Sequence, residues 1–218
     1  FARFGHPLIV LNLVKSTEKK RREGILRHEL TEAMIQINAS LPPEYRIIYI
    51  PWDFHKAFAK AKDEDVDVIT IMNSIAEQAI RNTGIFHSGT QLAANEKRNK
   101  TFPIEGGVPY AEGQVGRFQS GVVRSNCIDS LDRTNAAQYV TGKVAYGWQL
   151  YTLGLTASPL VDFDDDVVSL LVDMYQGMGN KLAVQYGGSN LAHTFSTYRD
   201  RNLVSKSRDL FTTITRFH

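Results

Sequence analysis

An unbroken run of apolar residues near the start of the chain, PLIVLNLV at positions 7–14, constrains the fold more than any other segment. A strand that is apolar on both faces needs cover on both faces, as a central strand of a parallel sheet does. Two later segments, RIIYI at 46–50 and GVVRSN at 121–126, also have strand character. Strands that alternate with helices predict an α/β fold whose mostly parallel sheet is flanked by helices. The helices expected around these strands lie at 18–39, 66–81 and 134–153.

The first and the third of these helices have a recognisable apolar face. Apolar side chains recur at helical spacing in both segments, and Gly154 provides a stop signal for the third helix. In the helix at 18–39 the predicted face consists of Leu26, Leu30, Met34 and Ile37. In the helix at 134–153 it consists of Ala136, Val140, Val144, Trp148 and Tyr151.

The remaining segments divide into a loop and a helical C-terminal part. A short strand is expected at 85–87, followed by a polar, glycine-containing loop at 88–119. A loop of that length is typical of functional or mobile segments. After the third helix, further helices are expected at 164–178, 189–199 and 207–216, with a turn at Gly187-Gly188.

Composition and charge narrow the class of protein. A chain of 218 residues with 43% hydrophobic and 22% charged residues is typical of a folded domain and excludes wholesale disorder. The net charge of +2 gives no reason to expect nucleic-acid binding. One basic run, which includes Lys15 and Arg22, is interpreted either as a solvated helix face or as a contact with an anionic lipid surface.

Single features of the sequence bear on compartment and on metals. The one cysteine excludes an intrachain disulfide and fits a reducing compartment such as the cytosol. No apolar run approaches the roughly 20 residues that a membrane-spanning helix needs. The chain begins at Phe1 with neither an initiator Met nor a signal peptide, and we interpret it as a piece of a longer protein. The six histidines are scattered, so no protein metal site and no cofactor are expected, with magnesium left as an open alternative.

The most informative stretch joins the strand at 121–126 to the helix at 134–153. It contains Cys127 and, six positions later, Arg133. A loop at a helix N-terminus presents free backbone N–H groups and the positive end of the helix dipole, which together bind anions. Cysteine is a nucleophile and arginine a bidentate phosphate ligand, so the pattern predicts a cysteine-dependent phosphatase. From spacing alone, a buried Cys beside a salt-bridged Arg is the alternative interpretation.

A thiol attacks phosphorus as a thiolate, so the loop must lower the pKa of Cys127. Lowering it from about 8.5 to about 5.5 requires roughly 4 kcal/mol, whereas a helix terminus supplies at most about 2 kcal/mol. The rest is expected from the Thr134 hydroxyl, the Arg133 charge and the loop N–H groups. The same groups should bind the equatorial oxygens of the transferred phosphoryl group. The loop residues expected at the substrate are Asn126, Ile128, Ser130, Leu131, Asp132 and Thr134.

The leaving oxygen needs a proton, and three carboxylates are available to supply it. Asp129 lies inside the loop and is the first choice for the general acid. Asp53 follows the strand at 46–50 and is the second choice, because strand ends are where α/β sheets place ligands. Asp132 is expected to accept the loop's own N–H groups. Arg124 is interpreted either as a second phosphate ligand or as an ion-pair partner of Asp129 or Asp132.

The stretch RSNCIDSLDRTN at 124–135 resembles the signature of the Sac-domain phosphoinositide phosphatases, Arg-x-Asn-Cys-x-Asp-Cys-Leu-Asp-Arg-Thr-Asn. Nine positions of this sequence match that signature, which is far more specific than Cys-x5-Arg. Other segments look like the same family across the whole chain. They are Phe4-Gly5, Trp52-Asp53-Phe54-His55, Thr83-Gly84 and Gln185-Tyr186-Gly187-Gly188-Ser189.

The resemblance is strongest to the vacuolar and endolysosomal branch of that family. It implies removal of the 5-phosphate from phosphatidylinositol 3,5-bisphosphate on the cytosolic face of endosomal or vacuolar membranes. It also implies a complex with the lipid kinase that makes this lipid and with a helical-repeat scaffold. Residues 1–218 would form the catalytic portion of a Sac domain, without its β-rich N-terminal subdomain. The competing functions are a dual-specificity protein phosphatase and a non-catalytic scaffold subunit.

One position departs from the family signature. The family usually has a second cysteine where this chain has Ser130. That position is not the nucleophile, so we expect catalysis to survive. The change removes a thiol that could protect Cys127 as a disulfide under oxidation.

Overall fold

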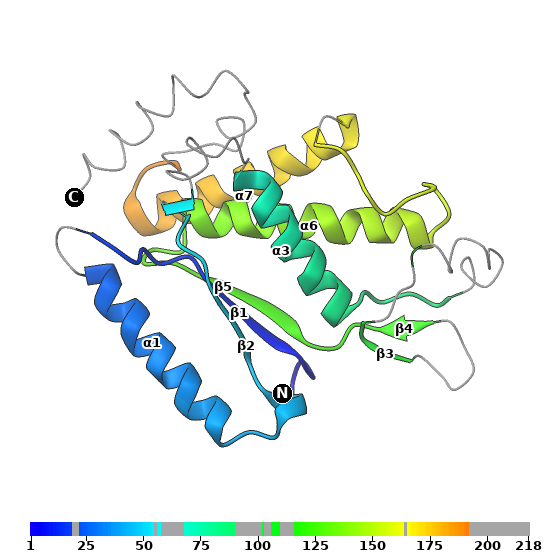
Figure 1. Ribbon diagram of the computed structural model, residues 1–218. Coiled ribbons are helices and arrows are strands. Elements are labelled where there is room, and N and C mark those ends of the chain that lie inside the picture. The colour runs from blue at the N-terminus through cyan, green and yellow to red at the C-terminus, as the bar shows by residue number, and fades with distance from the viewer. Residues whose placement is uncertain are drawn as a thin grey trace.

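The chain forms a parallel sheet of three strands in the order β2-β1-β5 (Figure 1). The strands are β1 (Leu8–Asn12), β2 (Ile48–Pro51) and β5 (Val122–Asn126). The structure is a computed structural model and describes residues 1–18, 22–54, 56–57, 68–89, 102, 106–109, 116–163 and 165–191. All three predicted strands are confirmed, and each of their ends lies within two residues of the expected bound.

Helices cover the two faces of this sheet. Helix α1 (Arg22–Ala39) lies on one side, and α3 (Val68–Thr83), α6 (Asp132–Thr152) and α7 (Asp166–Gly187) lie on the other (Figure 1). The larger core forms between the sheet, α3 and α6, and α7 packs on α6. The predicted α/β fold is therefore confirmed, and α7 supplies a helical C-terminal part.

Helix α6 is the central element of the larger core. Its predicted apolar stripe is buried throughout, from Ala136 to Tyr151. Leu153 closes the helix, and Gly154 follows with a φ of 79°, a conformation that favours glycine. Because α6 is fixed along its whole length, its first turn is a rigid support for the loop that precedes it.

The apolar face predicted for the first helix is wrong in part. Met34 is buried and Leu30 packs with it, but Leu26 and Ile37 are exposed at 53% and 43%. The smaller core on this side contains only Val10, Met34 and Ile47 as buried members. Helix α1 therefore contacts the described part of the sheet over its middle turns, and its ends extend beyond that contact.

Two further segments differ from the expectation. His87 forms a single bridge to Arg117 rather than a strand, and the expected loop contains a small hairpin of β3 (Val108–Pro109) and β4 (Arg117–Phe118). Helix α7 continues to Gly187, nine residues past its predicted end, and Gly188 closes it with a φ of 75°. The helices predicted at 189–199 and 207–216 lie outside the described residues, apart from positions 189–191.

Candidate active site

The carboxyl ends of all three strands meet at one edge of the sheet. In the parallel register Asn12 lies beside Pro51 on one side and beside Asn126 on the other. The loop at 127–131 leaves this edge directly from β5, and α6 begins at Asp132. This edge is where parallel α/β sheets bind their ligands.

Two buried amides fix the residue that precedes the cysteine. Asn126 Nδ2 donates to Asn12 Oδ1 across 2.9 Å, and Asn12 Nδ2 donates to the Tyr49 hydroxyl across 2.8 Å. Asn12 is fully buried. These bonds tie the ends of β1, β2 and β5 together and hold the start of the loop. Asn126 therefore acts here on the position of the loop, and Asn12 was not identified from the sequence.

The sulfur of Cys127 is surrounded by polar groups of its own loop. The Ser130 N–H donates to Sγ across 3.0 Å and the Thr134 hydroxyl across 3.5 Å, while Sγ donates to Asp129 Oδ1 across 3.0 Å. Ser130 has a φ of 56°, which turns the chain back toward the sulfur. Because Leu131 provides no side-chain cap, the first turn of α6 leaves its N–H groups available to the loop.

These contacts do not make Cys127 a ready thiolate. Burial raises the pKa of the thiol above its ordinary value, and Asp129 raises it further. The Thr134 hydrogen bond and the Arg133 charge act in the opposite direction but are outweighed. The expected lowering of the pKa is therefore wrong for this structure. The thiol donates its proton in a hydrogen bond to Asp129.

Arg133 is held in place by groups outside the loop. Its Nη1 donates to Leu13 O across 2.9 Å and to Glu23 Oε2 across 2.8 Å, and its Nη2 donates to Glu23 Oε1 across 3.4 Å. The side chain of Glu23 is 4% exposed, so this is a buried ion pair. The sequence analysis did not identify Glu23. An acidic residue in the first turn of a helix is ordinarily explained by the helix dipole, and no local pattern distinguishes this one.

The carboxylate of Glu23 also accepts a hydrogen bond from the backbone of Lys15 and forms an ion pair with its side chain. The Lys15 N–H donates to Oε2 across 2.9 Å, and Lys15 Nζ lies 3.8 Å from Oε1. Burial alone would raise the pKa of Glu23, but the hydrogen bonds from Arg133 and Lys15 and the charges of both outweigh burial and lower it. Glu23 is therefore ionised at neutral pH and links the β1–α1 connection to Arg133 at the start of α6.

Asp53, the second candidate for the general acid, is buried at the end of β2 and occupied by local bonds. Its Oδ2 accepts the Ser16 hydroxyl across 2.7 Å, and its Oδ1 accepts the Lys56 N–H across 3.0 Å. These bonds hold the β1–α1 connection against the segment after β2. His55, which belongs to the family-like segment 52–55, lies outside the described residues.

The remaining candidate residues lie in the loop, at the start of α6 and on β5. Ile128 and Leu131 belong to the loop, and the Leu131 N–H donates to Asp129 Oδ1 across 3.2 Å. Asp132 is the first residue of α6. Arg124 is exposed on β5 and, among the described residues, makes no ion pair with Asp129 or Asp132. Of the two interpretations of Arg124, the ion pair with Asp129 or Asp132 is therefore not formed, and its role as a phosphate ligand stays a prediction.

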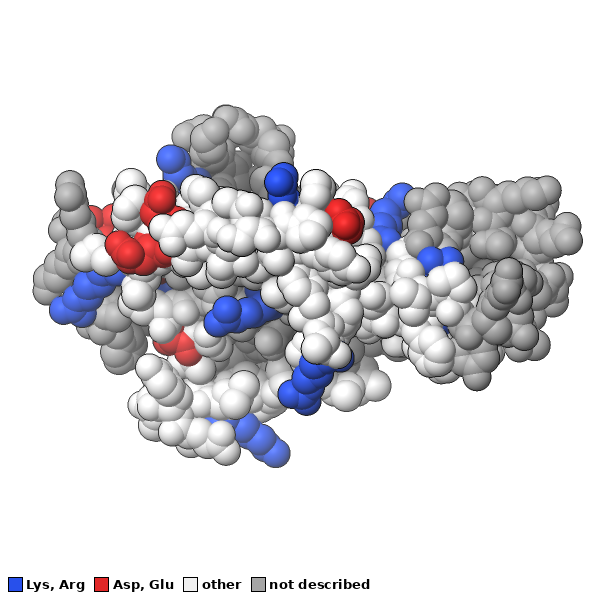
Figure 2. Space-filling view, turned by 90° about the horizontal axis from the view of Figure 1, so that it is seen from below, with Lys and Arg blue, Asp and Glu red and all other residues white. Residues whose placement is uncertain are grey.

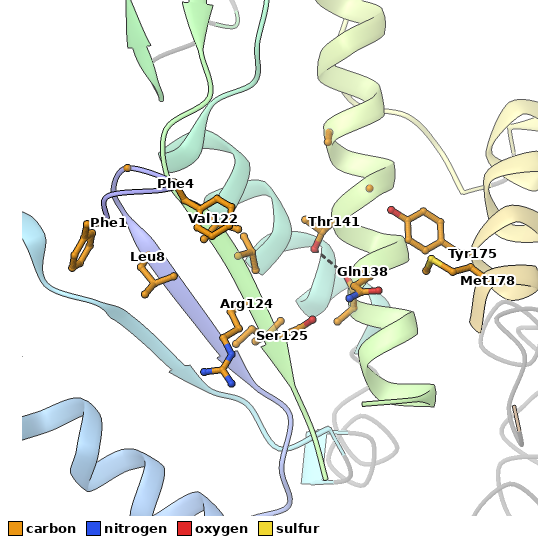
Figure 3. A pocket seen from close by; sticks show the side chains of 16 residues that line it. Phe1, Phe4, Leu8, Val122, Arg124, Ser125, Gln138, Thr141, Tyr175 and Met178 are labelled. Carbon is orange, nitrogen blue, oxygen red and sulfur yellow. Dashed lines mark hydrogen bonds between the residues drawn. The ribbon is translucent and has the colours of Figure 1, made fainter. Parts of the chain in front are cut away.

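A cavity of about 790 Å³ lies beside β5, on the side of the sheet that faces α6 and α7. It opens between β5 and the helices α6 and α7, with Leu8, Val122, Thr141 and Tyr175 among its lining side chains (Figure 3). Its lining is mostly apolar, and no residue from 127 to 133 contributes to it. The loop therefore carries the reactive groups.

Metal-binding clusters and membrane-spanning helices are both absent from the described ranges. Those ranges contain no group of three or more His, Cys, Asp or Glu side chains arranged to hold a metal ion. None of the helices described combines the length and apolar character needed to cross a bilayer. Of the basic run near the start, Lys15 and Arg22 are described. Figure 2 shows Lys and Arg side chains spread over one face singly or in small groups.

The fold and the loop together define an α/β protein whose Cys-x5-Arg-Thr loop connects a parallel strand to the start of a long helix. No family model matches the chain. The chain is 41% identical to the polyphosphoinositide phosphatase of Schizosaccharomyces pombe over all of its own length and 23% of the relative. It is 34% identical to the phosphatidylinositol-3-phosphatase SAC1 of Arabidopsis thaliana, over 99% of its length and 28% of the relative.

A third relative, the phosphoinositide phosphatase SAC4 of Arabidopsis thaliana, is 36% identical over 99% of this chain and 29% of the relative. Over nearly its whole length this chain is therefore similar to curated proteins that are named phosphoinositide phosphatases. The chain spans about a quarter of the length of these relatives.

Proposed function

We propose that residues 1–218 are the catalytic portion of a phosphoinositide phosphatase that works through a phosphocysteine. The hydrogen bonds that Ser130, Thr134 and Asp129 form with the sulfur of Cys127, together with the charge of Arg133 that acts on the thiol, carry this proposal. The names of the three relatives support an inositol lipid as the substrate. The loop residues 126–134 would contact the transferred phosphate.

In the first step the proton of Cys127 moves to Asp129, along the hydrogen bond that already joins them at 3.0 Å. The resulting thiolate attacks phosphorus. An S–P bond forms while the ester P–O bond breaks, and protonated Asp129 gives its proton to the leaving oxygen of the inositol ring. The entering phosphate oxygens are stabilised by Arg133 and by the N–H groups of the loop.

In the second step water hydrolyses the phosphocysteine. Asp129, now ionised, takes a proton from the attacking water, an O–P bond forms, and the S–P bond breaks. Inorganic phosphate leaves and the proton on Asp129 returns to the sulfur. Ser130 and Thr134 stabilise the thiolate that is released in this step, because both donate hydrogen bonds to Sγ.

The substrate within this class is proposed more finely as phosphatidylinositol 3,5-bisphosphate, cleaved at the 5-position. The polyphosphoinositide phosphatase name of the Schizosaccharomyces pombe relative supports a lipid with several phosphates. The same proposal places the protein on endosomal or vacuolar membranes. Its proposed partners are a lipid kinase and a helical-repeat scaffold. Arg124 is a secondary candidate for contact with the headgroup. Asp53 is the secondary candidate for the general acid.

The test is phosphate release by the full-length protein that contains this chain. The substrates are vesicles with each mono- and bisphosphorylated phosphoinositide, and a phosphotyrosine peptide. We expect release from the lipids, strongest from the 3,5-bisphosphate, and none from the Cys127→Ser variant. Preference for the peptide would replace this proposal by a protein phosphatase. A folded protein that releases nothing from any substrate would point to a scaffold.

A further inference from the structure

The guanidinium of Arg133 has five N–H donors, and the structure shows how three of them are used. Both donors of Nη1 are occupied, by Leu13 O and by Glu23 Oε2, and one donor of Nη2 points to Glu23 Oε1. Within the described part of the chain, Nε–H and the second Nη2–H have no acceptor. These two lie on one edge of the planar group and have the geometry that binds two oxygens of a phosphate.

The two acceptors of Arg133 come from a different part of the chain than the loop. Leu13 directly follows β1, and Glu23 lies in the first turn of α1. Glu23 is itself fixed, because its own N–H and that of Gly24 both donate to the Glu18 carboxylate. The orientation of the guanidinium is therefore set by the β1–α1 connection and not by the phosphate-binding loop alone.

A buried carboxylate next to an anion-binding loop is unfavourable for anion binding in simple Coulomb terms. Glu23 is 3% exposed, and both of its oxygens accept hydrogen bonds, so it cannot itself reach a substrate or transfer a proton to one. The one function that its contacts allow at the site is to hold the guanidinium of Arg133 in place. Lys15, 3.8 Å away, offsets part of the negative charge.

We propose that Glu23 is a positioning residue of this phosphatase, which orients Arg133 so that its Nε–Nη2 edge faces the phosphate. The proposal rests on the proposed function, and it identifies a residue outside the signature loop on which the reaction depends. A glutamine at this position keeps one acceptor oxygen but places an NH₂ group against donors of Arg133 or Lys15. An aspartate keeps the charge but is one methylene too short to reach both partners.

The first experiment measures kcat and KM for phosphate release by the full-length protein and its Glu23→Gln and Glu23→Asp variants. We expect Glu23→Gln to lower kcat and kcat/KM together by roughly 100-fold, which is the cost of a misplaced catalytic group. Glu23→Asp should fall between this variant and the wild type. Glu32→Gln is the matched control, since Glu32 is exposed on the same helix, and it should leave both constants unchanged. Equal kcat in all four folded proteins would overturn the proposal.

The second experiment measures binding of orthovanadate and does not depend on turnover. We expect Glu23→Gln to raise the Kd of orthovanadate about tenfold when Arg133 is present. In an Arg133→Ala background the same change should alter the Kd by less than twofold, because the residue acts through Arg133. A lower Kd in the first background would overturn the proposal, because it would show that Glu23 only repels the anion. An unchanged Kd would overturn it as well, because it would show that Glu23 has no effect on anion binding through Arg133. An equal rise in both backgrounds would also overturn it and indicate a general effect on folding.

The two experiments separate this proposal from the proposed function. If the wild type releases no phosphate from any lipid but binds orthovanadate in a manner that depends on Glu23 and Arg133, only the lipid phosphatase function fails. If the wild type releases phosphate and Glu23→Gln changes neither kcat nor Kd, only the role of Glu23 fails. Circular dichroism and thermal denaturation of each variant identify any protein that has lost its fold.

Discussion

At the scale of single residues, the contact between Cys127 and Asp129 determines how the proposed reaction would start. The carboxylate stabilises the protonated thiol, and burial acts in the same direction, so the sulfur is less acidic than an ordinary cysteine. A proton shared between nucleophile and general acid has an advantage, because it reaches the leaving oxygen without an exchange with solvent. The entering substrate must therefore trigger ionisation of the thiol.

This contact predicts two opposite effects of Asp129→Asn. Because Asp129 raises the pKa of Cys127, its removal should lower that pKa, and iodoacetamide should alkylate the thiol faster at neutral pH. Phosphate release from a lipid should fall by roughly 10²- to 10⁴-fold, because the general acid is lost. Alkylation rates as a function of pH and kcat on vesicles measure the two effects. If phosphate release stayed at the wild-type level, the general acid would have to be sought at Asp53.

The backbone of Ser130 yields a second prediction. Its φ of 56° lies in the left-handed region, which β-branched residues adopt poorly. Ser130→Val should therefore destabilise the loop by about 1–3 kcal/mol and raise the Kd of orthovanadate, because the Ser130 N–H would no longer reach the sulfur. Ser130→Gly is the matched variant and should keep both properties near wild type. Similar losses in the two variants would show that the hydroxyl matters rather than the backbone conformation.

At the scale of elements, the sequence was informative where apolar residues are continuous or periodic. β1 is buried over most of its length and α6 along its apolar stripe, whereas β5 is only half-buried; the apolar pattern of each segment was still sufficient to place it. The hairpin of β3 and β4 was missed because strands of two residues have no readable period. The face of α1 was predicted too wide, because periodicity does not show how much of a helix its partner covers.

The packing of α7 on α6 is close enough to make two nearby glycines behave differently. A Cβ added at Gly177 meets nothing within 4 Å, whereas one added at Gly179 would overlap Asn135 Nδ2 and lie 2.6 Å from Leu191 Cδ1. Gly177→Ala should raise the free energy of unfolding by about 0.5–1 kcal/mol through helix propensity. Gly179→Ala should lower it by about 1–3 kcal/mol through overpacking.

Thermal denaturation of both variants beside the wild type measures the difference. Asn135 follows Thr134 in the first turn of α6, so displacement of α7 at Gly179 should also weaken orthovanadate binding. If Gly179→Ala were as stable as Gly177→Ala, α7 would be free to move away from α6, and the start of α6 would depend less on it than we infer.

At the scale of the whole molecule, the site combines a local motif with distant supports. Residues 124–135 are contiguous, so the sequence alone could identify Cys127, Asp129 and Arg133 as candidates. Asn12 and Glu23 belong to other segments and reach the loop only because parallel pairing brings the ends of β1 and β5 together. Supports of this kind depend on register and on helix placement, which a single sequence does not specify.

Stability of the whole fold should depend on pH through His87, which is 8% exposed and lies at the bridge to Arg117. Burial lowers the pKa of His87 below 6.5, and the charge of Arg117 lowers it further. The unfolded chain then binds a proton that the folded chain does not, so stability decreases as the pH falls below about 6.5 toward the folded pKa.

His87→Gln removes this titration, and the difference in melting temperature between about pH 7.5 and pH 5.5 should become smaller in that variant. His28→Gln is the control, because His28 is exposed on α1, and it should keep the dependence of the wild type. An unchanged dependence in His87→Gln would mean that other groups control stability in this pH range.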